Sequence, residues 1–135
     1  MSASRSLLSL RNVLLVDAIT CAAMGALLIG GSAAIGHLTQ IPPALLFYAG
    51  LGLLPVAVFM GLVALRPVIP AAGVRLIVAG NILWVAGSLL LLGAGLITPN
   101  VLGLGFIVGQ AAVVAVLARL EHGALHEMIV STPAG

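Results

Sequence analysis

The sequence has very little charge. Of its 135 residues only 6% are Asp, Glu, Lys or Arg, whereas 62% are hydrophobic. A soluble domain carries charge on roughly a quarter of its residues, so this chain has too few polar groups to cover a surface that faces water. The composition therefore predicts an integral membrane protein whose first partner is the lipid bilayer.

Other absences exclude several kinds of site. The single cysteine, Cys21, permits neither an intrachain disulfide nor a multi-cysteine metal site. The long apolar segments contain no histidine, so the paired axial ligands of a membrane haem are missing. No Ser-His-Asp set, phosphate loop or nucleophile with a neighbouring base is visible, so we expect no catalytic activity and no cofactor. Five scattered Arg residues do not form a nucleic-acid patch, so we expect no nucleic-acid partner.

Long apolar segments make up most of the chain. Each is close to the roughly 20 residues that a helix needs to cross the hydrocarbon core. Helices are expected because a bilayer offers no water to the backbone, and the ten-residue alternation of a membrane barrel is absent. The connections are short, so sequential helices should pack as antiparallel neighbours. We predict a single all-α domain, 1–135, that is an up-down bundle of four transmembrane helices at about 12–35, 43–65, 75–96 and 101–120, with short tails at both ends.

All basic residues fall on one side of this arrangement. Two precede the first span, two lie in the middle connection and one ends the fourth span: Arg5, Arg11, Arg66, Arg75 and Arg119. The positive-inside bias then predicts a multi-pass protein of the cell inner membrane with both termini in the cytoplasm. The first apolar run is longer than the core of a signal peptide and contains an aspartate, so we expect it to be retained as an anchor.

One carboxylate, Asp17, lies inside the first span. Arg11 and Arg75 mark the membrane surface, and Asp17 and Asn81 each follow one of them by six residues, about 9 Å along a helix. The two side chains could therefore share a layer, and Asn81 could donate its amide hydrogens to the carboxylate. Arg11 or Arg75 could also reach toward it.

Further polar residues extend this layer into a candidate intramembrane site. Trp84 and Ser88 follow Asn81 on one helical face, and Gln110 lies near mid-depth of the fourth span. Because intramembrane ionisable residues are costly and often mark pathways, one interpretation is a polar site open to the cytoplasm, with Asp17 carrying a proton or cation. The other is that these residues form ordinary hydrogen bonds between helices and fix their register. The candidate set under both interpretations is Asp17, Asn81, Trp84, Ser88 and Gln110.

Two shorter patterns concern packing and metal binding. Gly105 and Gly109 form a small-xxx-small pair, which predicts close helix packing within one chain or between chains. His122 and His126 stand four residues apart, a spacing that can hold Zn²⁺ on a helix. A third ligand is missing and Gly123 weakens the helix, so we expect no metal site there.

The second half of the chain resembles a group of known membrane proteins. The segments VRLIVAGNILWVAGSLLLLGAG and LGFIVGQAAVVAVLARLEHGAL are similar to small, uncharacterised four-span proteins of bacterial inner membranes, with a layout that resembles DoxX-like proteins. The resemblance rests on Asn81, Trp84, Gln110 and Glu121, and it implies no assigned activity. The chain's size also resembles the small multidrug transporters, in which an essential first-span acid would correspond to Asp17. The segment VLLVDAITCAAMG does not match the first-span pattern of that family, and its dual-topology members lack a strong Arg bias.

These observations favour two functions from different classes. Small size, short loops, packing glycines and missing chemistry together predict an accessory or structural subunit, as a homo-oligomer or in a larger membrane complex. The alternative is a small proton- or cation-coupled transporter or channel that uses Asp17. A third possibility is an enzyme acting on a lipid or quinone, with Asp17, Asn81 and Trp84 lining its site.

Overall fold

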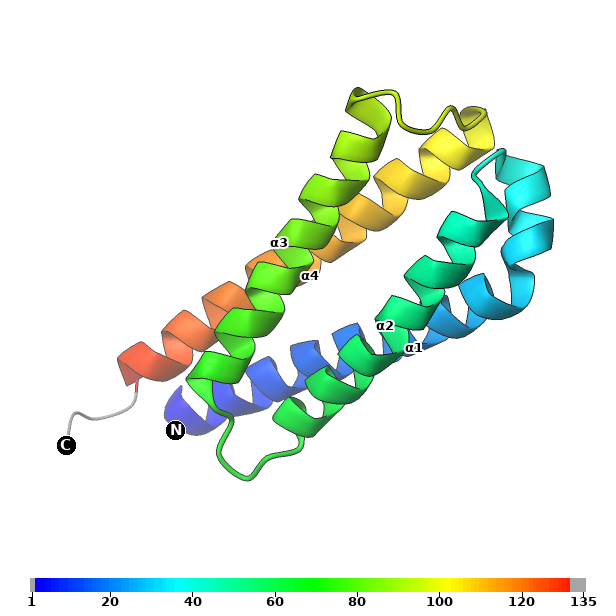
Figure 1. Ribbon diagram of the computed structural model, residues 1–135. Coiled ribbons are helices and arrows are strands. Elements are labelled where there is room, and N and C mark those ends of the chain that lie inside the picture. Colours follow the sequence, from blue (N-terminus) through cyan, green and yellow to red (C-terminus); the bar gives the residue numbers. More distant parts are fainter. Residues whose placement is uncertain (1, 132–135) are drawn as a thin grey trace.

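The computed structural model describes the backbone of residues 2–131 and the side chains of residues 10–130. Its four helices run alternately up and down, so that the start of α1, the end of α4 and the α2–α3 connection lie at one end of the molecule (Figure 1). Each helix is long and apolar enough to cross a membrane, which confirms the predicted all-α bundle of four spans. The helices are α1 (Ser2–Thr39), α2 (Pro43–Ala64), α3 (Ala71–Gly93) and α4 (Val101–Ser131).

Three helices have bounds that differ by more than one residue from the predicted spans. The first and fourth helices extend well beyond the apolar segments, because polar residues at the membrane surface continue the same backbone hydrogen bonding. The third begins at Ala71, directly after the N-cap Pro70, and ends three residues earlier than predicted. Its end is a Schellman motif, in which Gly95 has a φ of 69° and Leu96 N–H donates to Leu91 O at 3.1 Å.

The packing order departs from the order of the chain. α1 packs against α2 and α4, and α4 packs against α3, but α2 and α3 scarcely touch. The prediction that all sequential helices are packed neighbours is therefore wrong for this pair. The connection at 65–70 contains two prolines and lets the helices separate. As a result 11% of the α3 span is buried within the chain, against 33% of the α2 span, and the bundle is open between α2 and α3.

Arg11 closes the end of the bundle that carries the Arg residues. Its Nε donates to Ala64 O at 2.8 Å, and a terminal guanidinium nitrogen donates to Arg66 O at 2.7 Å. The last carbonyls of a helix have no partner within the helix, so this side chain from α1 caps α2. Arg11 therefore does not reach toward Asp17, and Arg75 is exposed.

Asn100 and Gly103 close the opposite end. The Asn100 Oδ1 accepts from Gly103 N–H at 2.9 Å as an N-cap of α4, and its Nδ2 donates to Leu38 O at 2.8 Å. Gly103 packs directly against the end of α1, where an added Cβ would meet Thr39 O and lie 2.6 Å from Pro99 Cβ. The absence of a side chain at Gly103 is what allows α4 to approach α1 this closely.

The glycines that pack between helices are not the predicted pair. An added Cβ at Gly50 of α2 would lie 2.8 Å from Gly25 O of α1, so these two residues let the helices meet. A Cβ at Gly105 or Gly109 would have nothing within 4 Å. The packing role predicted for that pair is therefore absent within the chain, and a role between chains stays a prediction.

We expect Gly103→Ala to lower the free energy of unfolding by about 1 to 3 kcal/mol, the usual range for overpacking a well-packed site. The reason is that the new methyl group would push α4 away from Thr39 O. Thermal unfolding followed by circular dichroism in detergent measures this change. Gly105→Ala is the matched control, since its methyl group enters open space on the same helix. Equal stability of the two variants would contradict the assigned contact.

Candidate functional site

Three polar side chains are buried together in the half of the bundle nearer the Arg residues. Asp17 of α1 is 1% exposed, Asn81 of α3 is 5% exposed and Glu121 of α4 is 0% exposed. The chain contains only three acidic residues, so two of them lie in this one cluster. We call Asp17, Asn81 and Glu121 the carboxyl centre.

The amide of Asn81 joins the two carboxyl groups. Its Nδ2 donates to Asp17 Oδ2 at 2.8 Å and to Glu121 Oε1 at 2.8 Å, which uses both amide hydrogens. Because both oxygens accept from the same nitrogen atom, the two carboxyl groups lie close together. On the other side of Asp17, the Cys21 Sγ donates to Oδ1 at 3.6 Å. The hydrogen bond from Asn81 to Asp17 is the one expected from the depth of both residues.

Positive charge is missing around this centre. Of the Arg side chains that the structure describes, none forms an ion pair with either carboxyl, and Arg11 binds backbone carbonyls instead. The Glu121 Oε2 is buried and has no hydrogen-bond partner. Two ionised carboxylates this close in an apolar environment repel each other strongly, and neither is paired. The centre therefore suits a bound proton or a small cation that would compensate one of the charges.

Glu121 is the residue that sequence reasoning missed as part of this site. The fourth span was predicted to end at 120, which placed Glu121 at the membrane exit, whereas α4 continues to Ser131. A signal was available in the spacing of the buried residues. Leu117, Ala118, Ala124 and Leu125 are all buried, and Glu121 falls on the same helical stripe. Extending that periodicity past 120 would have turned Glu121 inward.

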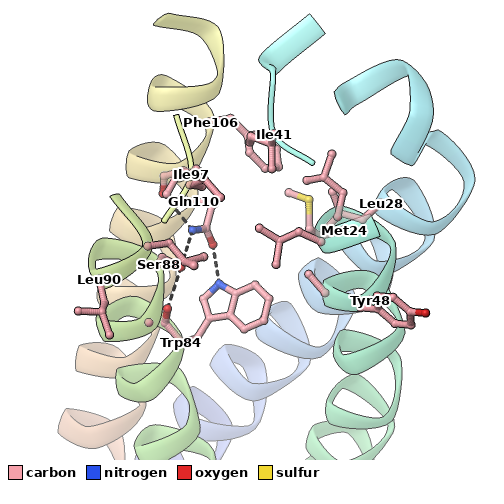
Figure 2. A pocket seen from close by; sticks show the side chains of 16 residues that line it. Met24, Leu28, Ile41, Tyr48, Trp84, Ser88, Leu90, Ile97, Phe106 and Gln110 are labelled. Carbon is pink, nitrogen blue, oxygen red and sulfur yellow. Dashed lines mark hydrogen bonds between the residues drawn. The ribbon is translucent and has the colours of Figure 1, made fainter. Parts of the chain in front are cut away.

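The other predicted polar residues form a second, separate network farther from the Arg-bearing end. The indole Nε1–H of Trp84 donates to Gln110 Oε1 at 2.6 Å, and Gln110 Nε2 donates to Ser88 Oγ at 3.1 Å (Figure 2). Gln110 Nε2 also donates to Ile107 O at 2.9 Å, and the Ser88 hydroxyl donates to Trp84 O at 2.8 Å. We call Trp84, Ser88 and Gln110 the indole network. The predicted set is thus divided between two sites.

Two cavities lie between α2 and α3, on either side of Trp84. The distal cavity has a volume of about 600 Å³ and is lined by residues of all four helices, including the indole network. The proximal cavity has a volume of about 470 Å³. Its lining includes Asn81 of the carboxyl centre and Cys21, which contacts the centre through Asp17. Trp84 lines both cavities, so its indole separates the carboxyl centre from the distal cavity.

The remaining predicted residues lie on the surface. His122 and His126 are exposed on α4, and among residues 10–130 no group of three potential metal ligands is found. Arg66, Arg75 and Arg119 are also exposed, and Arg119 comes two residues before Glu121 in α4 rather than at the end that Arg11 closes. The Arg5 side chain lies outside the described residues.

We expect Asn81→Ala to lower the free energy of unfolding by about 1 to 3 kcal/mol, because both buried carboxyl groups lose their shared donor. Thermal unfolding in detergent measures the loss. Ile82→Ala is the control, since this neighbouring side chain is exposed on the same helix. If both variants unfold at the same temperature, the Asn81 amide does not stabilise the bundle.

Comparison with known proteins found no relative of this chain. No family model matches the chain, and neither the curated proteins nor the solved structures contain a significant match. The resemblance to small four-span proteins of bacterial inner membranes therefore stays a prediction. The chain is a multi-pass, four-helix membrane protein whose function has to be argued from the carboxyl centre and the cavities beside it.

Proposed function

We propose that this protein is a small ion-coupled membrane carrier in which the carboxyl centre binds a proton or a monovalent cation. The observation that carries the proposal is the sharing of one neutral amide by two buried carboxyl groups that have no basic partner among the side chains of residues 10–130. Buried charges in a bilayer are strongly disfavoured, and the residues that bear them commonly serve proton or ion pathways. Asp17, the residue that the sequence suggests for this role, therefore acts together with Glu121.

The surroundings support exchange of the bound ion rather than permanent storage. The proximal cavity is lined by Asn81 and Cys21, so the centre lies next to a cavity through which a bound ion can exchange under this proposal. Cys21 is the further titratable group in contact with Asp17, through its thiol. Arg11 and Arg66 lie at the nearer end of the bundle, and the positive-inside bias favours a cytoplasmic location for that end.

The proposal is tested first by proton binding. Infrared spectra of the purified protein, recorded across a pH titration in detergent, detect the carbonyl band of a protonated carboxyl group. We expect one such band to be lost in Glu121→Gln or Asp17→Asn and to persist in Glu127→Gln, because Glu127 is exposed on the same helix. A band that is unchanged in both centre variants would overturn the proposed role of the carboxyl centre.

Ion coupling is tested in liposomes. Under a pH gradient, with a pH-sensitive dye inside, we expect wild-type protein and Glu127→Gln to carry protons at equal rates. Asp17→Asn should fall to the level of protein-free liposomes, because the amide cannot take up and release a proton at neutral pH. Gel filtration of each variant confirms that the fold is intact. Wild-type flux no greater than that of protein-free liposomes would contradict the carrier function.

An accessory or structural subunit is the second candidate function, and the exposure of α3 favours it. This helix packs almost entirely on α4, and both Gly80 and Gly87 face open space on it. Small residues allow the close approach of another transmembrane helix, from a second copy or a larger membrane complex.

The accessory function predicts a stoichiometric partner after gentle purification from native membranes, identified by mass spectrometry. Gly80→Leu should remove that partner, because the larger side chain blocks the groove without a clash inside the chain. Gly93→Leu is the matched control near the end of the same helix, where a Cβ also has nothing within 4 Å. Recovery of the protein alone from wild-type membranes would exclude this role.

A further inference from the structure

The distal cavity is a site for which the carrier function assigns no ligand. Its volume of about 600 Å³ lies within the range of small-molecule sites, and its walls are almost entirely apolar. Met24 and Leu28 of α1, Tyr48 of α2 and Phe106 of α4 surround it (Figure 2). Because α2 and α3 scarcely touch, the cavity lies where the bundle is open to the surrounding lipid.

The only polar part of the wall is the indole network, and its donors are already used. The single indole hydrogen goes to Gln110 Oε1, and the two amide hydrogens of Gln110 go to Ser88 Oγ and Ile107 O. The Ser88 hydroxyl hydrogen goes to Trp84 O. The Tyr48 hydroxyl points away from the cavity (Figure 2). The wall therefore offers a ligand hydrogen-bond acceptors, at Gln110 Oε1 and Ser88 Oγ, but no free donor.

This arrangement selects the chemistry of a ligand. A head group with acceptors only, such as a quinone, would find no donor and would lose its hydrogen bonds to water on binding. A cationic head group would find no counter-charge, because no charged residue lines the cavity. An uncharged hydroxyl group can donate to Gln110 Oε1 or Ser88 Oγ without either penalty.

We propose that the distal cavity binds an uncharged long-chain alcohol, with its hydroxyl on the indole network and its hydrocarbon chain toward Ile41 and Ile97. These two buried residues line the end of the cavity away from the Arg residues. The ligand reaches the cavity from the bilayer, between α2 and α3. The site does not depend on the carboxyl centre, so Glu121→Gln leaves its binding unchanged.

The chain's single tryptophan makes this site directly measurable. Trp84 is the only indole and lines the cavity, so its fluorescence reports on contact with a quenching bromine atom. The probes are a long-chain alcohol brominated next to its hydroxyl end and the methyl ether of the same compound, titrated into full-length protein in nanodiscs. The ether keeps the size of the alcohol but cannot donate.

We expect saturable quenching and an apparent affinity about five- to tenfold higher for the alcohol than for the ether, the worth of one hydrogen bond. In the double variant Gln110→Leu/Ser88→Ala both acceptors are removed and the indole N–H becomes a free donor to either probe, so the preference should fall to about one. Circular dichroism confirms that this variant is folded. Equal affinity for alcohol and ether in the wild type, or a preference that survives in the double variant, would overturn the proposal.

A second variant tests the place of binding without altering the indole network. Gly87 lines the distal cavity and a Cβ there meets nothing within 4 Å, so Gly87→Leu fills the space without a clash. We expect it to abolish saturable quenching. Gly105→Leu, at a glycine that is equally open but outside the cavity, should bind as the wild type does. Quenching that is unchanged in Gly87→Leu, or tighter binding of the matching brominated amine by the wild type, would also overturn the proposal.

Discussion

A polar group buried within a membrane needs a hydrogen-bond partner, and the Asn81 amide provides one for both buried carboxyl groups. The side chain of Asn81 bonds to α1 through Asp17 and to α4 through Glu121. Apolar packing gives α3 little attachment of its own, since it meets only α4 over most of its length. Hydrophobic burial does not distinguish a neighbouring helix from lipid, so hydrogen bonds and close packing must decide where a helix sits. Among the described residues, the bond from Asn81 to Asp17 is the side-chain hydrogen bond that links α3 to α1.

The same amide also sets the chemistry of the centre. A single Asn has two hydrogens to donate, and both are used on carboxyl oxygens. The Glu121 Oε2 is left over, buried and without a partner. A basic residue at this position would have compensated one of the two carboxylate charges. The neutral amide holds the helices together and leaves both carboxyl groups without a compensating charge from Asn81.

The sequence predicts the four helices well, since their length and composition follow from the thickness of the bilayer. It also predicts the pairing of Asp17 with Asn81, because the Arg residues supply a depth scale. Glu121 was missed because apolarity alone was used to end the fourth span, although the helix continues. The separation of α2 from α3 was not predictable, since α2 is apolar on every face and no stripe on it indicates which side meets a neighbour. For the same reason, the sequence does not show which glycines pack against a neighbouring helix.

Arg11 has two roles in this chain, one from its charge and one from its hydrogen bonds. Its charge contributes to the Arg bias from which the orientation is predicted, and its planar fork holds the Ala64 and Arg66 carbonyls. A lysine would keep the charge, but its ammonium is a point donor on a flexible stem and would not reproduce the paired geometry. The predicted charge bias and the observed cap of α2 thus share one side chain. A chain with lysine here would keep the charge bias and hold the end of its second helix less firmly.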